Sequence, residues 1–310
     1  MNEAEVMLSV IIPVYNHEKY IAKALDSVLM QKTRYSFEVL VGDDVSTDNS
    51  RAILKEYEEK HPGFFKMFYR EHNMHREAIN NSKDLVNRAC GKYLITLEGD
   101  DYWLDEYKIE KQVAFLEEHP DYLAVAHNCI IVDDDSNPTG ETYPECKDEE
   151  YTIWHYANEI LPGQTATLMC RNYVKNALFD RSLMNLNLAP GDRRKIFTLI
   201  TNGKVYCIQE AMSAYRHVTT HGSSYSANIK YQYSKTQKWY AAQLEYAYKL
   251  NHPDAIKCAE LQYALEIRSA VLKKRVKMGQ AMKDLKILRH RLRSAFSVLK
   301  RDIRRVFKRK

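Results

Sequence analysis

The stretch Lys92-Tyr-Leu-Ile-Thr-Leu97 runs directly into Glu98-Gly-Asp-Asp-Tyr-Trp103, so an apolar strand ends in a cluster of acids. Three carboxylates within four residues repel one another, and a chain that places them at the end of a buried strand has a use for a bound cation. Oxygen-rich clusters suit hard divalent cations such as Mg²⁺ or Mn²⁺. The stretch therefore predicts metal-assisted chemistry on a phosphate-bearing substrate.

The residues before this stretch alternate short apolar runs with helical patterns. We expect strands at 8–14, 37–41, 64–69 and 92–97, and helices at about 19–30, 48–60 and 78–89. Strict alternation of strand and helix predicts a mostly parallel sheet covered by helices. In such sheets ligands bind beyond the carboxyl ends of the strands, and two acid pairs follow strands directly, Asp43 with Asp44 and Asp100 with Asp101.

The glycine loops that usually hold nucleotides are missing from the chain. No GxGxxG follows the first strand, where Pro13-Val-Tyr-Asn16 stands instead, and no GxxxxGK[ST] occurs. Phosphate charge would then have to be met by a divalent metal held on carboxylates.

Three motifs in this order carry a family resemblance: Ser9-Val-Ile-Ile-Pro-Val-Tyr-Asn16, Val41-Gly-Asp-Asp-Val-Ser-Thr-Asp48 and Gly91-Lys-Tyr-Leu-Ile-Thr-Leu-Glu-Gly-Asp-Asp-Tyr-Trp103. Together they closely resemble the family 2 glycosyltransferases, and the resemblance extends more loosely to about Ser224. It implies the GT-A fold, which is a Rossmann-like α/β sheet, and a nucleotide-diphosphate-sugar donor. It also implies a Mn²⁺ or Mg²⁺ cofactor and transfer to an acceptor hydroxyl with inversion at the anomeric carbon.

The resemblance assigns roles to residues of the donor site. Pro13 and Tyr15 match positions that hold the base, although Tyr15 could equally be a packing aromatic. Asp44 matches the acid that hydrogen-bonds the pyrimidine edge. Asp100 matches the residue that meets the ribose, and Asp101 matches the carboxylate that binds the metal.

The catalytic base and the closing segment are also assigned by resemblance. Asp192, in Ala189-Pro-Gly-Asp192 at the start of a helix, matches the family's base, and the alternative is a simple helix cap. Arg216 matches a position that approaches the diphosphate. His221 is a candidate metal ligand, with His217 a weaker candidate. One departure from the family pattern is Val45, which stands where glycine or cysteine often follows the acid pair.

Charge is divided unevenly along the chain. Sixteen of the 46 basic residues and two of the 41 acidic residues lie in 271–310, which leaves 30 basic and 39 acidic residues in 1–270. Apolar residues recur every three or four positions in this basic tail, at Leu285, Leu288, Leu292, Phe296, Leu299, Ile303 and Phe307. The pattern predicts a basic amphipathic helix that lies on an anionic membrane surface, or packs on the preceding helices or on another subunit.

Cysteine usage and the N-terminus indicate a compartment. The six cysteines contain no CxxC pair, which argues against a zinc module or a disulfide scaffold and favours reduced thiols. Residues 1–5 are acidic where a signal peptide would be basic, and no apolar run approaches the length of a membrane span. We therefore expect a cytoplasmic protein, peripheral on the inner face of the membrane.

The sequence also predicts two domains and a role in polysaccharide synthesis. Residues 1–224 would form the GT-A transferase domain and 225–310 a helical extension. The acceptor would be a saccharide or a lipid-linked saccharide in capsule, O-antigen or other surface-polysaccharide synthesis. No nucleic-acid partner is expected, because the body is acidic and the aromatics of the tail lie only in its apolar stripe. The alternative is a non-catalytic scaffold or a membrane-binding subunit.

Overall fold

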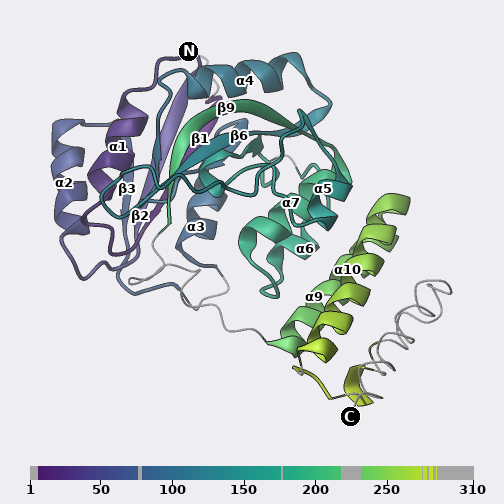
Figure 1. The fold of residues 1–310 in the computed structure, drawn as a ribbon. Helices are drawn as coiled ribbons and strands as arrows, with labels where there is room; N and C mark the ends of the chain where they lie inside the picture. The colour runs from purple at the N-terminus through teal and green to yellow at the C-terminus, as the bar shows by residue number, and fades with distance from the viewer. Residues whose placement is uncertain are drawn as a thin grey trace. The chain divides into compact units, whose positions relative to one another are not determined.

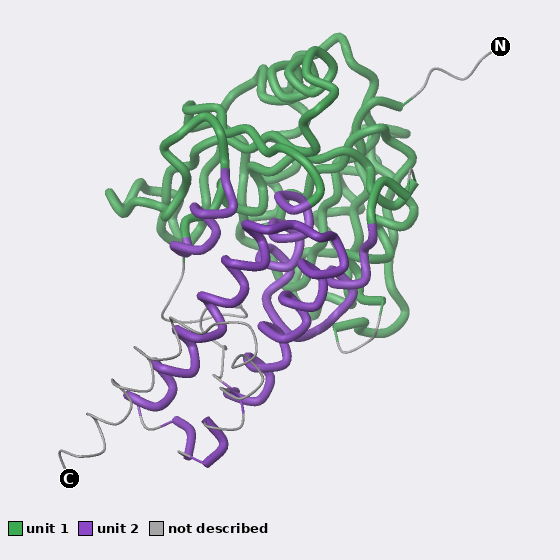
Figure 2. The backbone as a smooth tube through the Cα atoms, turned by 90° about the vertical axis from the view of Figure 1, so that its right-hand side faces the viewer, with its two compact units in different colours: residues 1–151, 160–179, 202–228 green, residues 152–159, 180–201, 229–310 purple. Residues whose placement is uncertain are grey.

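A computed structural model describes residues 6–75, 79–175, 177–217, 232–273, 275–277, 279–281 and 284. The chain forms two compact units. The first comprises residues 1–151, 160–179 and 202–228, and the second comprises 152–159, 180–201 and 229–310 (Figure 2). The domain boundary expected at 224 and 225 lies outside the described residues and stays a prediction.

The first unit is built on a mixed sheet that contains nine strands within the described residues (Figure 1). The strands are β1 (Leu8–Val14), β2 (Phe37–Asp43), β3 (Phe65–Tyr69), β4 (Tyr93–Thr96), β5 (Tyr102–Trp103), β6 (Tyr122–Val132), β7 (Glu150–Tyr151), β8 (Met169–Arg171) and β9 (Lys204–Arg216). Their order is β3-β2-β1-β4-β8-β6-β9-β5, and β7 pairs with β9. The first four strands are parallel, as predicted, whereas β5, β7 and β8 run antiparallel to their neighbours.

Helices cover both faces of this sheet. They are α1 (Ile21–Leu29), α2 (Ser50–Lys60), α3 (Asn81–Arg88) and α4 (Lys108–Glu118). Helices α1, α2 and α4 share one hydrophobic core with the strands, to which β2 contributes Val39 and Val41. Helix α3 packs on the opposite face, where a Cβ on Gly42 would lie 2.4 Å from Asn81 Oδ1. Glycine at position 42 therefore lets α3 approach the sheet closely.

A buried carboxylate fixes the amino ends of the strands. Glu38 Oε1 accepts hydrogen bonds from Ser9 Oγ at 2.5 Å and from the main-chain N–H of Cys90 at 2.6 Å, and Oε2 accepts one from Lys66 Nζ at 2.7 Å. Burial acts to raise the pKa of Glu38, but the bonds from Lys66, Ser9 and Cys90 outweigh it and hold that pKa below the usual range. The ionised carboxylate thus joins β1 and β2 to the residues before β4.

The second unit is helical within the described residues. It contains α5 (Ile153–Ala157), α6 (Ser182–Asn185), α7 (Gly191–Asn202), α9 (Tyr233–Lys249) and α10 (Pro253–Leu272). Helices α9 and α10 confirm the expectation that the C-terminal part of the fold is helical, and they pack through Leu244, Tyr263 and Ile267. Residues just beyond them return to the same core, because Ala281 is buried there and Asp284 Oδ2 accepts a hydrogen bond from Tyr233 Oη at 2.7 Å.

The predicted amphipathic stripe from Leu285 to Phe307 lies outside the described residues. Among the helices that are described, none is both long and apolar enough to span a bilayer.

Candidate functional site

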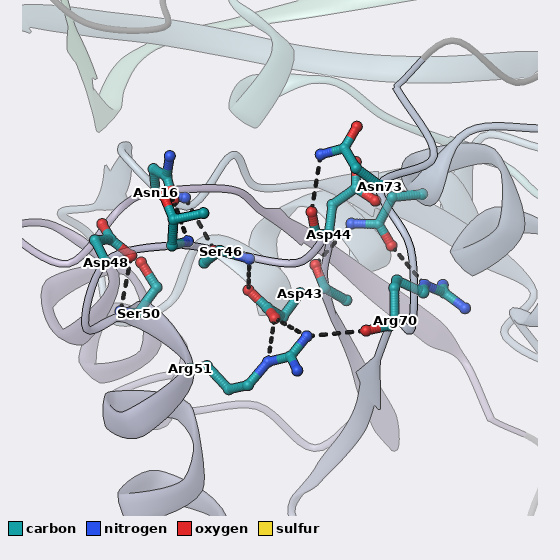
Figure 3. A network of polar contacts seen from close by, with 12 residues as sticks. Asn16, Asp43, Asp44, Ser46, Asp48, Ser50, Arg51, Arg70 and Asn73 are labelled. Atoms are coloured by element: carbon teal, nitrogen blue, oxygen red, sulfur yellow. Dashed lines mark hydrogen bonds and ion pairs between the residues drawn. The ribbon is translucent and has the colours of Figure 1, made fainter.

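The loops that follow β1 and β2 are hydrogen-bonded to each other (Figure 3). The main-chain N–H of Asn16 donates to Ser46 Oγ at 3.0 Å, and Asn16 Oδ1 accepts from the N–H of Thr47 at 2.7 Å. Asn16 and Val45 have left-handed backbones, with φ of 57° and 62°. For a β-branched valine this conformation is strained. The two loops therefore form a single fixed structure beyond the carboxyl ends of the strands.

The two acids at the end of β2, Asp43 and Asp44, have different environments. Asp43 is buried, and its Oδ2 accepts a hydrogen bond from Arg51 Nε at 2.6 Å (Figure 3). Asp44 Oδ1 accepts from the N–H of Met74 at 2.7 Å, and its main-chain oxygen accepts from Asn73 Nδ2 at 2.9 Å. Oδ2 of Asp44 has no hydrogen-bond partner in the part of the chain that the structure describes. Asp43 thus stabilises the fold, whereas Oδ2 of Asp44 can accept a hydrogen bond from a ligand.

The predicted base contacts lie beside Asp44. Pro13 is paired with Gly42 in the parallel register of β1 and β2, and the main-chain N–H of Asp44 donates to the oxygen of Val14 at 2.9 Å. Tyr15, the next residue, is 37% exposed. The structure therefore brings Pro13, Tyr15 and Asp44 together at the carboxyl ends of the two strands.

The acidic turn after β4 collects three carboxylates. Glu98, Asp100 and Asp101 each offer one oxygen, and these atoms all lie within 4.8 Å of one another. Asp101 is 2% exposed, and burial, together with the charges of Asp100 and Glu98, raises the pKa of Asp101 well above that of an ordinary aspartate. Three convergent carboxylate oxygens are ligands that Mg²⁺ and Mn²⁺ prefer. The residues present therefore fit a divalent cation.

The carboxylate of Asp101 is held on both sides by protein donors. Oδ1 accepts a hydrogen bond from the main-chain N–H of Arg216 at 2.8 Å, and Oδ2 accepts one from Gln164 Nε2 at 2.7 Å. These donors come from residues 115 and 63 positions away in the chain. The acidic turn is therefore supported by the end of β9 and by the segment before β8.

Arg216 adds side-chain bonds to this support. Its Nε donates to the main-chain oxygen of Asp100 at 3.0 Å, and Nη1 donates to the main-chain oxygens of Asp133 and Asp134 at 2.5 and 2.9 Å. Nη2 donates to Ser136 Oγ at 2.9 Å. A guanidinium has five N–H groups, and these hydrogen bonds use four of them. The predicted contact of Arg216 with the diphosphate stays a prediction.

Two residues near the turn were missed by sequence reasoning. Gln164 donates a hydrogen bond to Asp101. His17 packs against the turn, because a Cβ on Gly99 would lie 2.6 Å from His17 Nδ1. No local pattern marks either residue, because the partner in each case comes from a distant part of the chain. The glycine at 163, directly before Gln164, is the one signal that a close backbone approach occurs there.

The two predicted histidines have different outcomes. His221 lies outside the described residues, so its role as a metal ligand stays a prediction. His217 is described, and its Nδ1 lies 3.2 Å from Glu141 Oε2.

Asp192 lies in the second unit, in the first turn of α7. Its Oδ1 accepts the main-chain N–H of Arg193 at 2.7 Å. The guanidinium of Arg193 lies 5.4 Å from the ring centre of Tyr156, whose hydroxyl accepts a hydrogen bond from Gln243 Nε2 at 3.0 Å. These contacts anchor the turn that carries Asp192, and its role as the base stays a prediction.

Comparisons with known proteins identify relatives of the chain. The family model described as Glycosyl transferase family 2 matches residues 9–185, which is more than half of the chain. An uncharacterized protein of Mycobacterium tuberculosis is 30% identical over 226 residues, covering 71% of this chain and 61% of that protein. The chain thus spans about three fifths of that relative's length. The Bacillus subtilis protein TuaG, named as a candidate teichuronic acid biosynthesis glycosyltransferase, is 35% identical over 118 residues, which is 38% of this chain and 45% of TuaG.

A solved structure has the same fold. The crystal structure of S. aureus TarS 1-349 in complex with UDP-GlcNAc superposes with a TM-score of 0.69 at 17% identity, covering 97% of this chain and 89% of that one. The similarity confirms the predicted fold class, a mostly parallel α/β sheet flanked by helices with further helices at the C-terminal end.

Proposed function

The chain belongs to glycosyl transferase family 2, and from this we propose that it transfers a sugar from a nucleotide-diphosphate-sugar to an acceptor hydroxyl with inversion. One observation carries the proposal. Asp44 and the turn of Glu98, Asp100 and Asp101 stand beyond the carboxyl ends of β2 and β4, the strands that flank β1. A base acceptor and a cation-binding cluster on the two strands that flank β1 suit the two ends of a nucleoside diphosphate.

The proposed donor carries a uracil or a similar base. Oδ2 of Asp44 accepts a ring N–H, which uracil presents, and the exposed ring of Tyr15 offers a stacking surface. The UDP-GlcNAc in the TarS crystal structure supports a uridine nucleotide. We expect Pro13 to border the base and Asp100 to meet the ribose.

The proposed reaction is a single displacement. Asp192 takes the proton of the acceptor hydroxyl as that oxygen attacks the anomeric carbon, and the bond to the diphosphate breaks with its electron pair on the leaving phosphate oxygen. A Mg²⁺ or Mn²⁺ ion held by Asp101 would neutralise the charge that develops on the leaving nucleoside diphosphate. We expect the remaining N–H of Arg216 to add a hydrogen bond to the same phosphate oxygens.

The proposed acceptor is a saccharide or lipid-linked saccharide of a cell-surface polysaccharide. The similarity to TuaG over 118 residues supports this assignment. The excess of positive charge in 271–310 supports attachment to an anionic membrane surface, on the cytoplasmic side where nucleotide sugars are made.

A panel of nucleotide sugars tests the proposal. The protein is incubated with each donor and Mn²⁺, and free nucleoside diphosphate is measured by chromatography. We expect release from a uridine donor, loss of at least 100-fold in Asp101→Asn, and wild-type rates in Asp121→Asn, whose exposed carboxylate is ion-paired with Lys204. If no donor is consumed, or if Asp101→Asn is fully active, the proposal is wrong.

A further inference from the structure

We propose that Gln164 is a positioning residue, whose side-chain amide holds the carboxylate of Asp101 in the orientation in which the acidic turn binds a divalent cation. The inference rests on the proposed function, because that function gives the acidic turn its cation.

The orientation of the Gln164 amide is fixed by its own partners. The residue is 3% exposed, and its Oε1 accepts the main-chain N–H of Ala166 at 2.6 Å. Because the amide oxygen is taken by this N–H, the amide nitrogen must face the other way. It donates to Asp101 Oδ2 at 2.7 Å. Reversing the amide would break both hydrogen bonds, so a single orientation is specified.

The second oxygen of Asp101 completes the arrangement. Oδ1 accepts the main-chain N–H of Arg216 at 2.8 Å, so a donor on each oxygen fixes the plane of the carboxylate. Each oxygen has two lone pairs, and one on each remains for a ligand. Hydrogen bonds of this kind orient metal ligands in proteins. The N–H of Arg216 belongs to the main chain, so Gln164 supplies the donor that a substitution can remove.

The backbone around Gln164 is shaped for this contact. A Cβ on Gly163 would lie 2.1 Å from Thr167 Oγ1 and 2.7 Å from the main-chain oxygen of His127. Only glycine therefore fits at position 163. Thr167 Oγ1 in turn donates to the main-chain oxygen of Gln164 at 2.7 Å. These contacts close the 3₁₀ turn η1 (Thr165–Thr167), which Gln164 caps.

The same turn also holds the strand that follows the acids. Trp103 is 1% exposed, and its indole Nε1 donates to the main-chain oxygen of Ala166 at 3.2 Å. Asp101 and Trp103 are thus both bonded to residues 164–166. This two-point attachment sets the position of the acidic turn, and the bond from Gln164 sets the orientation of its buried carboxylate.

The test compares Gln164→Met with a matched control, Asn172→Ala, in the full-length protein. Asn172 is also a buried amide of the first unit, with Nδ2 donating to the oxygen of Gly91 at 2.8 Å and Oδ1 accepting the N–H of Val174 at 3.0 Å. Neither contact involves the acidic turn. Free Mn²⁺ is measured by electron paramagnetic resonance, and exchange of the amides of 98–103 is measured by mass spectrometry, both below the Tm of every variant.

We expect Gln164→Met to raise the Mn²⁺ dissociation constant by about tenfold or more, as loss of an outer hydrogen bond to a metal ligand commonly does. Amide exchange in 98–103 should also become faster. Asn172→Ala should lower Tm while leaving both quantities at their wild-type values. If Gln164→Met does not fold, Gln164→Asn replaces it. Asparagine keeps the amide, but its side chain is one methylene too short to reach Asp101.

Two results would overturn the role of Gln164. One is a Mn²⁺ dissociation constant of Gln164→Met that lies within twofold of the wild-type value. The other is a Tm of Gln164→Met that is lowered as in Asn172→Ala, without faster amide exchange at 98–103. Wild-type protein that consumes no nucleotide sugar would instead refute the proposed function, and Mn²⁺ binding and amide exchange would still decide the role of Gln164.

Discussion

A methyl group on Gly99 would lie 2.6 Å from Nδ1 of His17, so the imidazole fits against the acidic turn only because residue 99 has no side chain. His17 follows the loop after β1, and its main-chain oxygen accepts the N–H of Ile21 at the start of α1 at 2.9 Å. The position of the turn is therefore tied to the position of this helix.

Gly99→Ala should displace the acidic turn and lower kcat/KM for the nucleotide sugar by at least tenfold. His17→Ala in the same chain should restore much of that loss, because it removes the atom with which the methyl group collides; a double-mutant cycle measures the coupling. Gly203→Ala is the matched control, since Gly203 directly precedes β9 and its Cβ would lie 2.5 Å from Leu123 Cγ of β6. It should lower the free energy of unfolding without changing kcat/KM for the nucleotide sugar. A double variant no more active than Gly99→Ala would contradict this account.

Val45→Gly should raise the free energy of unfolding by about 1 kcal/mol, because relief of a strained left-handed valine exceeds the extra backbone entropy of glycine. Val45→Ala keeps a Cβ and should gain less. Urea denaturation measures both changes. A glycine variant less stable than wild type would show that the φ of 62° at Val45 is not a source of strain.

Glu38→Gln should destabilise the protein by about 1–3 kcal/mol at neutral pH, because buried donors lose a charged acceptor. Since the pKa of folded Glu38 lies below the usual range, the stability it contributes is present above the ordinary glutamate pKa and is lost as pH falls through the folded value. The difference between the two proteins should therefore shrink below about pH 4. Urea denaturation from pH 7 to pH 3 tests the sign, and a difference that grows in acid would contradict it.

Asp192→Asn should reduce sugar transfer by about 100-fold or more, since the amide cannot accept the acceptor proton. Binding of UDP, measured by calorimetry, should stay unchanged. A transfer rate within threefold of wild type would remove Asp192 from the mechanism and leave it as a residue of the first turn of α7.

Removal of the basic tail should abolish sedimentation with vesicles that contain anionic lipid. The chain is best ended after Asp284, because Ala281 is buried in the core of α9 and α10 and Asp284 accepts the hydroxyl of Tyr233. Activity on a soluble acceptor is the control for folding. If the protein that ends at 284 still sediments with these vesicles, the tail is not the membrane contact.

Prediction from sequence was reliable where short-range patterns carried the information. The strands at β1 to β4 and the helices between them have strong periodicity and lie within a few residues of their expected ends. The antiparallel strands β5 and β8 have two and three residues, too few for a period to show.

The site was predictable only in part, for a similar reason. Asp44 and Asp101 stand in motifs, and their positions at strand ends follow from the alternation of strand and helix. The hydrogen-bond partners of Asp101 could not be predicted in this way. Gln164 and Arg216 lie 63 and 115 residues from Asp101 in the chain, and only the folded sheet brings them together. The burial of Asp43 against Arg51 likewise depends on the packing of α2, which no motif encodes.

The reciprocal bonds of Asn16 with Ser46 and Thr47 have a consequence for engineering this enzyme class. A loop transplanted after β1 alone would arrive without the residues that hold it, and the same is true of a loop transplanted after β2. In this chain the two loops can therefore be exchanged only together.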